Sequence, residues 1–317
     1  MSTHPNQPET LQTNHYAKGL ILSLTTAVMW GVLPLFLILC LKQMDSSTIT
    51  FYRFVFAGVV VLFILIAQRR LKPVLHMPIK WRSMLFFTTF LLVLNYVTNV
   101  LGLVYLSPGS VQILMQIAPF ALMAGGVFFF KESLTKTQKT GIVVLITGLM
   151  LFFQQRLPDI LTSDKEQPIG IVIIAFSALV WASYALLQKN LLKQYSANQL
   201  NVFLYLVGAL MLLPFSELGS VSELSVGLLL ALLFCCINTL VAYGAFTEAL
   251  RVWDASRVSA VLSTTPLFTF IFSEIADAIW PALFYVPNVS AMAYVGAGLV
   301  MLGSMICALG KRTPKAV

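Results

Sequence analysis

Long apolar stretches of about 20 residues alternate with short polar breaks along almost the whole chain. An α-helix needs about 20 apolar residues to cross ~30 Å of hydrocarbon. The pattern therefore predicts an all-α polytopic membrane protein with ten transmembrane helices. A transmembrane barrel would instead show about 10-residue segments of alternating polarity, which the sequence lacks. The expected spans are residues 19–40, 47–67, 83–105, 108–130, 138–154, 169–192, 198–216, 225–249, 256–277 and 289–310.

Composition agrees with this class. The 317 residues are 58% hydrophobic and only 10% charged, and the mean hydropathy is +0.87. A soluble domain usually has about 25% charged residues, so a soluble protein of this length is not expected. The four cysteines all lie inside apolar stretches without metal-ligand spacing, and we interpret them as small core residues.

The basic residues predict the orientation of the chain. Sixteen of the 20 lysines and arginines fall in segments on the same side of the membrane as the two termini. Lys and Arg are retained on the cytoplasmic side, so both termini are expected there. Residues 1–18 and 311–317 would be cytoplasmic tails, and residues 155–168 an outer linker loop. The net charge of +8 then reflects topology and the lipid bilayer, and no nucleic-acid partner is expected.

The first predicted span occurs twice. Without a gap, the stretch Gly19–Gln43 aligns with Gly170–Gln194, and this places Trp30 opposite Trp181. A second common offset aligns Tyr96 with Tyr243 and Pro119 with Pro266. Five spans separate the matched segments, and because five is odd the two halves must cross the membrane in opposite directions. The sequence thus predicts two inverted five-helix repeats, residues 19–154 and 169–310, an architecture that recurs in secondary transporters.

Several positions together resemble a known family. They are Trp30 and Trp181 in spans one and six, the Arg53–Phe54 pair, Pro119 and Pro266, Glu132 at the end of span four, and the Gly141/Gly148 pattern. With ten spans and an inverted duplication, they resemble the EamA-type transporters of the drug/metabolite transporter superfamily. The resemblance covers about residues 19–310 and implies a transporter. One departure is that Ile279 stands thirteen residues after Pro266, where the first half has Glu132 after Pro119.

Polar side chains inside the spans are the candidate substrate-binding residues. Such side chains are costly when they face lipid and tend to face the interior of the helix bundle. The alternative is that they form interhelical hydrogen bonds, which are common in membrane proteins and worth about 0.6–2 kcal/mol. The candidates are Trp30, Asn95, Asn99, Gln112, Gln116, Trp181, Tyr184, Asn238, Tyr243 and Ser263.

Charged residues in or near the spans form a second group of candidates. Arg53 is the basic residue deepest within a span, about six residues from its outer end, and it would either snorkel or pair with an acid, or attract a carboxylate or phosphate substrate. Glu274 and Asp277 share one helical face, as either a solvated interfacial pair or a proton-coupling pair. Ser263 and Glu274 are eleven residues apart, about three turns of one helix, so Glu274 is expected on the stripe that faces the cavity. Glu132 is expected to form an ion pair with the neighbouring lysines.

These features favour a secondary transporter in the cell (inner) membrane that exports amino acids or other small metabolites by alternating access. A channel or sensor is the alternative. An enzyme is not expected, because the three histidines lie in the tail or a loop, and no metal or cofactor is expected. No phosphate-binding glycine loop is present, which argues against an ATP-driven pump. Proton coupling, exchange and uniport stay open, as do a monomer and a homodimer.

Overall fold

A computed structural model describes residues 9–71, 76–154, 167–281 and 291–309. Ten of its helical segments are long and apolar enough to cross a membrane, and their ends lie within four residues of the predicted spans. The first helix begins at Glu9, so part of the expected tail is already helical. The tail 311–317 and most of the linker 155–168 lie outside the described residues. The helices are α1 (Glu9–Cys40), α2 (Ser46–Ala67), α4 (Ile79–Tyr105), α5 (Pro108–Leu114), α6 (Ile117–Phe130), α7 (Lys136–Phe153), α9 (Gln167–Leu191), α10 (Ala197–Leu212), α11 (Val226–Asn238), α12 (Gly244–Val252), α13 (Ala255–Leu262), α14 (Thr265–Ile279) and α15 (Ala291–Leu309).

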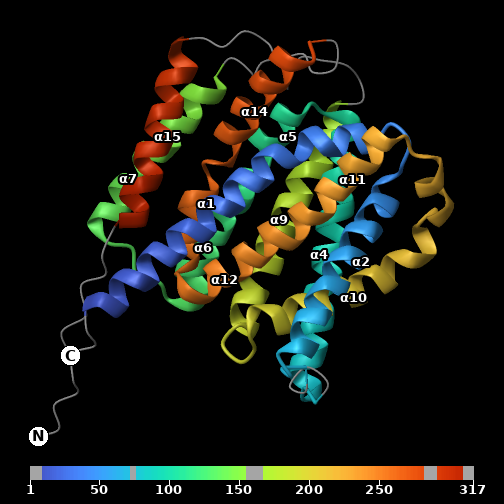
Figure 1. Ribbon diagram of the computed structural model, residues 1–317. Coiled ribbons are helices and arrows are strands. Elements are labelled where there is room, and N and C mark those ends of the chain that lie inside the picture. Colours follow the sequence, from blue (N-terminus) through green and yellow to red (C-terminus); the bar gives the residue numbers. More distant parts are fainter. Residues whose placement is uncertain (1–8, 72–75, 155–166, 282–290, 310–317) are drawn as a thin grey trace, which may run out of the picture.

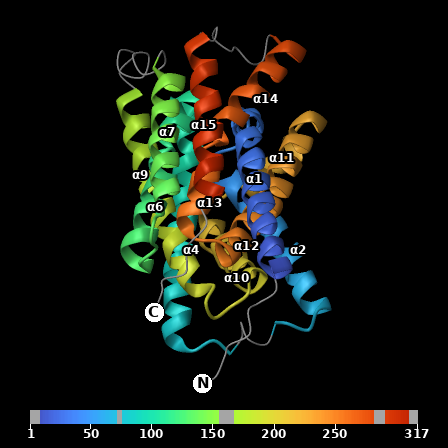
Figure 2. The same ribbon diagram turned by 90° about the vertical axis from the view of Figure 1, so that its left-hand side faces the viewer.

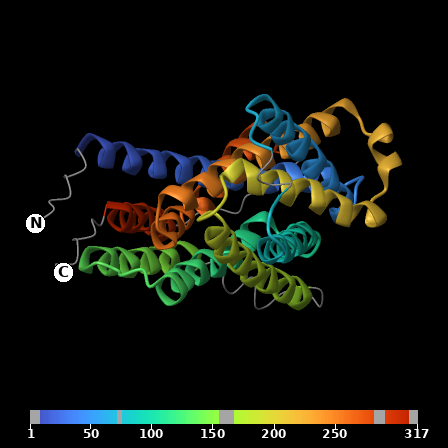
Figure 3. The ribbon, with the colours of Figure 1, turned by 90° about the horizontal axis from the view of Figure 1, so that it is seen from below.

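The first helix of each repeat packs against the third and fourth spans of the other repeat. α1 packs against α11, α12 and α14, and its counterpart α9 packs against α4 and α6, which are the counterparts of those helices. The remaining helices pair with their own counterparts, α2 with α10 and α7 with α15. Figures 1 and 2 show α7 and α15 side by side, and Figure 3 shows them at one edge of the bundle, away from α2 and α10. The fold is therefore the inverted duplication that the sequence predicts.

Glycines allow α7 and α15 to approach closely. A Cβ atom on Gly141 would lie 2.9 Å from the Gly303 carbonyl oxygen, and one on Gly148 would lie 2.9 Å from that of Gly296. Small residues at such positions are what lets membrane helices pack backbone to backbone. Both pairs have a spacing of seven residues, so the contact repeats itself symmetrically across the interface.

Spans four and nine are each broken near a proline, where the sequence leaves open a kink or simple packing. α5 ends at Leu114 and α6 begins at Ile117, and the equivalent break separates α13 from α14 at Ser263 and Thr264. A proline lacks an N–H and clashes with the carbonyl four residues earlier. Pro119 and Pro266 act on the carbonyls of residues 115 and 262, so each break follows from its proline.

Counterparts in the first four spans of each repeat follow from two offsets, and the glycines of α7 and α15 follow from a third offset of 155, which relates Gly148 to Gly303. Trp30 and Trp181 differ by 151 residues, and this offset also relates the helix caps Asp45 and Ser196. Tyr96 and Tyr243 differ by 147, which relates α4–α6 to α11–α14. Span eight differs from its counterpart α4 because a π-helical turn, Thr239–Tyr243, separates α11 from α12.

The bundle has two ends. The start of α1 and the end of α15 lie at the same end, toward the lower left of Figure 1, together with the α6–α7, α9–α10 and α12–α13 connections. We call this end the terminal face and the other end the opposite face. Ten is an even number of spans, so the chain ends at the face where it started.

Candidate functional site

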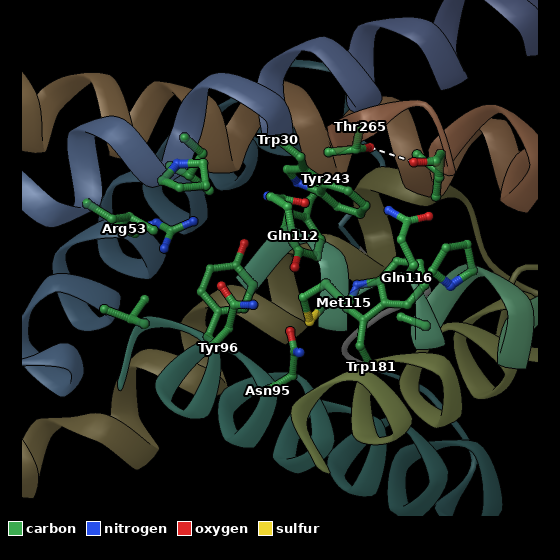
Figure 4. Close-up of a pocket in the computed structure, with 18 residues that line it drawn as sticks. Trp30, Arg53, Asn95, Tyr96, Gln112, Met115, Gln116, Trp181, Tyr243 and Thr265 are labelled. Carbon is green, nitrogen blue, oxygen red and sulfur yellow. Dashed lines mark hydrogen bonds between the residues drawn. The ribbon is translucent and has the colours of Figure 1, made fainter. Parts of the chain in front are cut away.

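A cavity lies between the two repeats, near the middle of the bundle. It contains about 730 Å³ of space free of atoms, part of it open to the outside. Its walls come from α1, α2, α4, the two helix breaks, α9 and the π turn (Figure 4). The lining residues are Trp30, Leu33, Pro34, Leu37, Arg53, Asn95, Tyr96, Asn99, Val100, Gln112, Met115, Gln116, Ala118, Pro119, Trp181, Tyr243, Leu262 and Thr265.

Aromatic counterparts meet across the centre of the bundle. The rings of Trp30 and Trp181 are edge to face with centroids 5.6 Å apart, and those of Tyr96 and Tyr243 are 5.0 Å apart. Phe246 packs against both Trp30 and Trp181, at 5.4 and 5.1 Å. Such contacts contribute ~0.5–1.5 kcal/mol each beyond burial. These rings form a layer that closes the cavity toward the terminal face.

Arg53 contributes the charge of the cavity. Its side chain is 2% exposed, its Nε donates to Thr239 Oγ1 at 2.9 Å, and its guanidinium lies over the Tyr96 ring, 4.5 Å from the centroid. It neither snorkels to the surface nor pairs with a carboxylate among the described residues, so that alternative from the sequence is wrong. An arginine inside a membrane helix costs ~2.5–3.5 kcal/mol on insertion scales. Charged residues inside membrane helices therefore usually serve a function.

Amide side chains complete the polar lining. Gln112 lies on α5, Gln116 in the first helix break, and Asn99 on α4. Among the described residues, the buried Gln116 Oε1 and Trp30 Nε1 have no hydrogen-bond partner. Buried polar atoms are normally paired with protein, water or ligand. These atoms are therefore available to hydrogen-bond a solute.

Eight of the predicted residues converge on this cavity. Seven were expected to bind substrate, and Arg53 was the eighth. Asn95 lines the wall and also joins α4 to α9 by hydrogen bonds. Its Nδ2 donates to Ser177 Oγ at 2.9 Å and to the Ser177 carbonyl oxygen at 3.0 Å. The seven are Trp30, Asn95, Asn99, Gln112, Gln116, Trp181 and Tyr243.

Three predicted residues lie outside the cavity in this conformation. Asn238 donates to the Met29 carbonyl oxygen at 2.5 Å, which joins span eight to α1. The Ser263 hydroxyl donates to the Ser259 carbonyl oxygen within its own helix, and Tyr184 is fully buried below the aromatic layer. All three belong to the second repeat, whose side of the interface is tightly packed.

Glu274 and Asp277 also lie away from the cavity. Glu274 is exposed and Asp277 partly exposed on α14, and neither lines the described cavity. The count of three turns from Ser263 to Glu274 assumed one continuous helix. The break at Ser263 and Thr264 interrupts that helix, so the count does not place Glu274 on the cavity stripe.

Several lining residues are not among the candidates expected from the sequence. Tyr96 was used only to align the repeats, although its partner Tyr243 was selected, so the repeat itself could have identified it. Thr265 corresponds to Ala118, and Leu262 to Met115, by the offset of 147. These residues follow from the helix breaks, which have no signal in the sequence beyond the prolines.

Beneath the aromatic layer, a polar network joins three helices of the second repeat. Gln188 Nε2 donates to Thr247 Oγ1 at 3.1 Å, and the Thr247 hydroxyl also lies 3.0 Å from Asn201 Oδ1. All three side chains are buried. No described residue of the first repeat provides the partners in these bonds, so they stabilise the second repeat internally.

Glu132 closes the terminal face by joining the two repeats. The chain turns after α6 through Lys131, whose φ is 54°, and this turns the Glu132 carboxylate back into the bundle. The carboxylate accepts hydrogen bonds from the Ala255 and Ser256 backbone N–H groups at 2.9 and 3.0 Å and lies 3.5 Å from Lys189 Nζ. An acid is favourable at a helix N-terminus. The expected ion pair exists, but its partner is Lys189 of the other repeat, not a neighbouring lysine.

Comparison with known proteins agrees with this architecture. The pattern of the EamA-like transporter family matches twice, at residues 17–154 and 168–309. A protein of Escherichia coli K12 named as an uncharacterized inner membrane transporter, YhbE, is 38% identical over 93% of this chain and 92% of its own. A Haemophilus influenzae protein named as an uncharacterized transporter is 34% identical over 93% and 95%. A crystal structure with 15% identity covers 92% of this chain and 97% of its own at a TM-score of 0.69, which shows a shared fold. The protein is a multi-pass membrane protein of the EamA-like transporter family.

Proposed function

We propose that this protein is a secondary transporter that moves small metabolites by alternating access around the cavity between its repeats. The observation that carries this proposal is an asymmetry between counterparts. Several lining residues of the first repeat have counterparts in the second repeat that are 0% exposed and line no described cavity. These pairs are Leu37 and Gln188, Asn99 and Phe246, Val100 and Thr247, Gln112 and Ser259, and Gln116 and Ser263.

Exchange of the two conformations gives the second state. In this second state, each repeat adopts the packing that the other repeat has here. Gln188, Thr247 and Ser259 would then line a cavity open to the terminal face. Inverted repeats make both states accessible, within a few kcal/mol of each other, because each half has both conformations available to it. A bound solute then moves between the faces as the equilibrium shifts.

The cavity suits a small solute with an apolar body and hydrogen-bonding ends. Its walls combine the indole and phenol rings with amides from Asn99, Gln112 and Gln116. Amino acids or other small metabolites have this chemistry. With the terminal face in the cytoplasm, as the basic residues predict, the cavity of this conformation would face outward, and we propose export as the direction of transport.

The concentration gradient of the solute itself is the simplest energy source for this cycle, through exchange or uniport. No acidic side chain lines the cavity among the described residues, so no carboxyl there is placed to exchange a proton for the solute. Proton coupling would need a titratable group elsewhere, and Glu274 with Asp277 remains the candidate pair. A comparison of transport with and without a pH gradient separates these schemes.

Cysteine labelling tests the two states. In a variant without the four native cysteines, Gln112→Cys should react with an impermeant maleimide added from the opposite face. Thr247→Cys should react only from the terminal face, and faster when saturating solute drives turnover. Reaction of both cysteines from the same face, or no reaction of Thr247→Cys during active transport, would refute the exchange of conformations.

Proteoliposomes test transport itself. Vesicles loaded with a mixture of amino acids should release them faster with the protein than without it. A labelled solute outside should accumulate transiently against an unlabelled pool inside, because a carrier must return loaded or empty. A channel gives no such counterflow, so its absence together with rapid release would favour the channel alternative.

A further inference from the structure

We propose that Arg53 binds a carboxylate of the transported solute, so that the protein accepts small organic acids and zwitterions and rejects solutes whose only charge is positive. This inference rests on the proposed transport function and specifies its substrate class. It depends on three features of the cavity: an unbalanced charge, a guanidinium with one free edge, and a single cationic position in the two repeats.

The cavity has one charge and no described group to balance it. Arg53 is the only charged residue among the 18 that line the cavity. In the described part of the chain, no carboxylate lies within 4 Å of its guanidinium. The Tyr96 ring face partly compensates the charge, since a ring quadrupole attracts a cation. A buried charge is stabilised fully only when it is paired, so an anionic group of the solute is the missing partner.

The geometry leaves one edge of the guanidinium for the solute. Thr239 donates its hydroxyl proton to the Cys235 carbonyl oxygen at 3.0 Å, so its oxygen accepts from Arg53 Nε with a fixed orientation. The Tyr96 ring covers one face of the guanidinium plane. Figure 4 shows the guanidinium directed toward the space between Tyr96 and Gln112. An arginine presents its donors in a planar fork that matches the two oxygens of a carboxylate.

The repeats show that only one anionic group is accommodated. The counterpart of Arg53 is Leu204, which is 0% exposed. Exchange of the two conformations therefore brings no second cation into the cavity, and the same arginine must serve both states. A phosphate monoester carries up to two negative charges and would leave one unbalanced. A carboxylate leaves none, which is why we assign the site to carboxylates.

The rest of the cavity selects the body of the solute. The rings of Trp30, Trp181 and Tyr243 provide an apolar wall beyond Tyr96. The Gln112 amide lies between this wall and Arg53, and the Gln116 amide lies on the far side of the cavity from Arg53. An ammonium group has no described carboxylate to pair with in this cavity and would contact neutral groups, such as amide and hydroxyl oxygens and ring faces. It is tolerated and not required.

Matched solutes test the proposal. We would measure release from proteoliposomes of 3-phenylpropionate (carboxylate only), L-phenylalanine (both charges), L-phenylalaninamide and phenethylamine (ammonium only), with leucine and leucinamide as an aliphatic pair and phenyl phosphate as the phosphate. Each acid should be released at least tenfold faster than its amide or amine. The same acids should raise the melting temperature of the detergent-solubilised protein, and the amides should not.

Variants of the arginine complete the test. Arg53→Met should remove the preference for acids, Arg53→Lys should keep a weaker preference, and the surface variant Arg82→Met should behave like wild type. Equal or faster release of amides or amines, a preference for phenyl phosphate, or a preference that survives Arg53→Met would overturn the proposal. Transport of amides alone would leave the transporter function standing, whereas no transport of any solute would count against that function itself. If Arg53→Met does not fold, the wild-type melting shifts and Arg53→Lys still decide.

Discussion

The two repeats have the same framework and different chemistry. Fourteen of the 18 lining residues come from the first repeat and four from the second. Where the first repeat has Arg53, Asn99 and Gln112, the second has Leu204, Phe246 and Ser259. All four lining residues of the second repeat have counterparts that also line the cavity. The symmetric residues thus form the centre of the cavity, and the residues that differ provide its polarity and its open side.

The ends of spans four and nine also differ in chemistry, because one has an acid and the other an apolar residue. Glu132 ties the first repeat to α13 and Lys189 at the terminal face. Its counterpart Ile279 is 58% exposed at the opposite face and makes no equivalent contact. The closed end of the molecule therefore has a buried ionic contact that the open end cannot reproduce, even after the two repeats exchange conformations.

The largest expected effect comes from breaking that difference. Glu132→Ala should destabilise the protein by about 3 kcal/mol, because it leaves the largely buried Lys189 with only the Trp253 carbonyl oxygen as a partner and the α13 N–H groups without an acceptor. The counterpart variant Ile279→Ala should change stability by less than about 1 kcal/mol, since its side chain is largely exposed. Thermal unfolding in detergent measures both. Equal effects would mean that the two ends are energetically alike.

A smaller loss should follow from crowding the symmetric interface. Gly303→Ala would place a Cβ 2.4 Å from the Leu145 nitrogen, and the counterpart variant Gly148→Ala would place one 2.6 Å from the Val300 nitrogen. Each should cost about 2 kcal/mol through forced separation of α7 and α15. Gly298→Ala is the control, because nothing lies within 4 Å of its Cβ position. Unequal losses at Gly303 and Gly148 would show that this interface is not symmetric.

Two asparagines on one helix should separate binding from packing. Asn99→Ala should lower the transport rate about tenfold, equivalent to ~1.4 kcal/mol, with an unchanged melting temperature. Asn95→Ala should lower stability by about 1–2 kcal/mol, because it removes the two hydrogen bonds that Asn95 Nδ2 donates to the buried Ser177. Transport assays and unfolding curves on both variants give four values. A stability loss at Asn99 would assign it to interhelical packing.

The smallest effect is expected at the pair of acids on α14. Glu274→Gln should change accumulation under a pH gradient by less than about twofold, since this exposed side chain lies outside the cavity and a twofold change is only ~0.4 kcal/mol. Accumulation lost with exchange preserved would instead identify Glu274 as the proton-coupling group. That result would place proton coupling in the second repeat and carboxylate binding in the first.

The sequence predicted the framework more completely than the site. Hydrophobic length determines the spans, and the matched Trp30 and Trp181 reveal the duplication, so both follow from local pattern alone. The surroundings of Arg53 could not be predicted, because Thr239 and Tyr96 reach it from other helices. Likewise the partner of Glu132 is 57 residues away in Lys189, and the lysines beside it in sequence were a misleading guide.

The state of the second-repeat candidates also could not be read from sequence. Ser263 is the counterpart of Gln116, and both sit at helix breaks, but only one lines the cavity. Residue type and spacing identify the residues that line the cavity in either conformation. A single conformation exposes one set and buries the other, so a list of polar positions combines the two states.

The contact between Glu132 and α13 has a consequence for solute concentration. If it favours the conformation closed at the terminal face by about 3 kcal/mol, fewer than about 1% of empty molecules are open to that face. Apparent affinity falls in proportion to the population of the competent state. A solute on the terminal side would then need roughly a hundredfold higher concentration than one on the opposite side to occupy the same cavity. With the terminal face in the cytoplasm, the transporter would act as an overflow valve that responds only when its solute accumulates inside the cell.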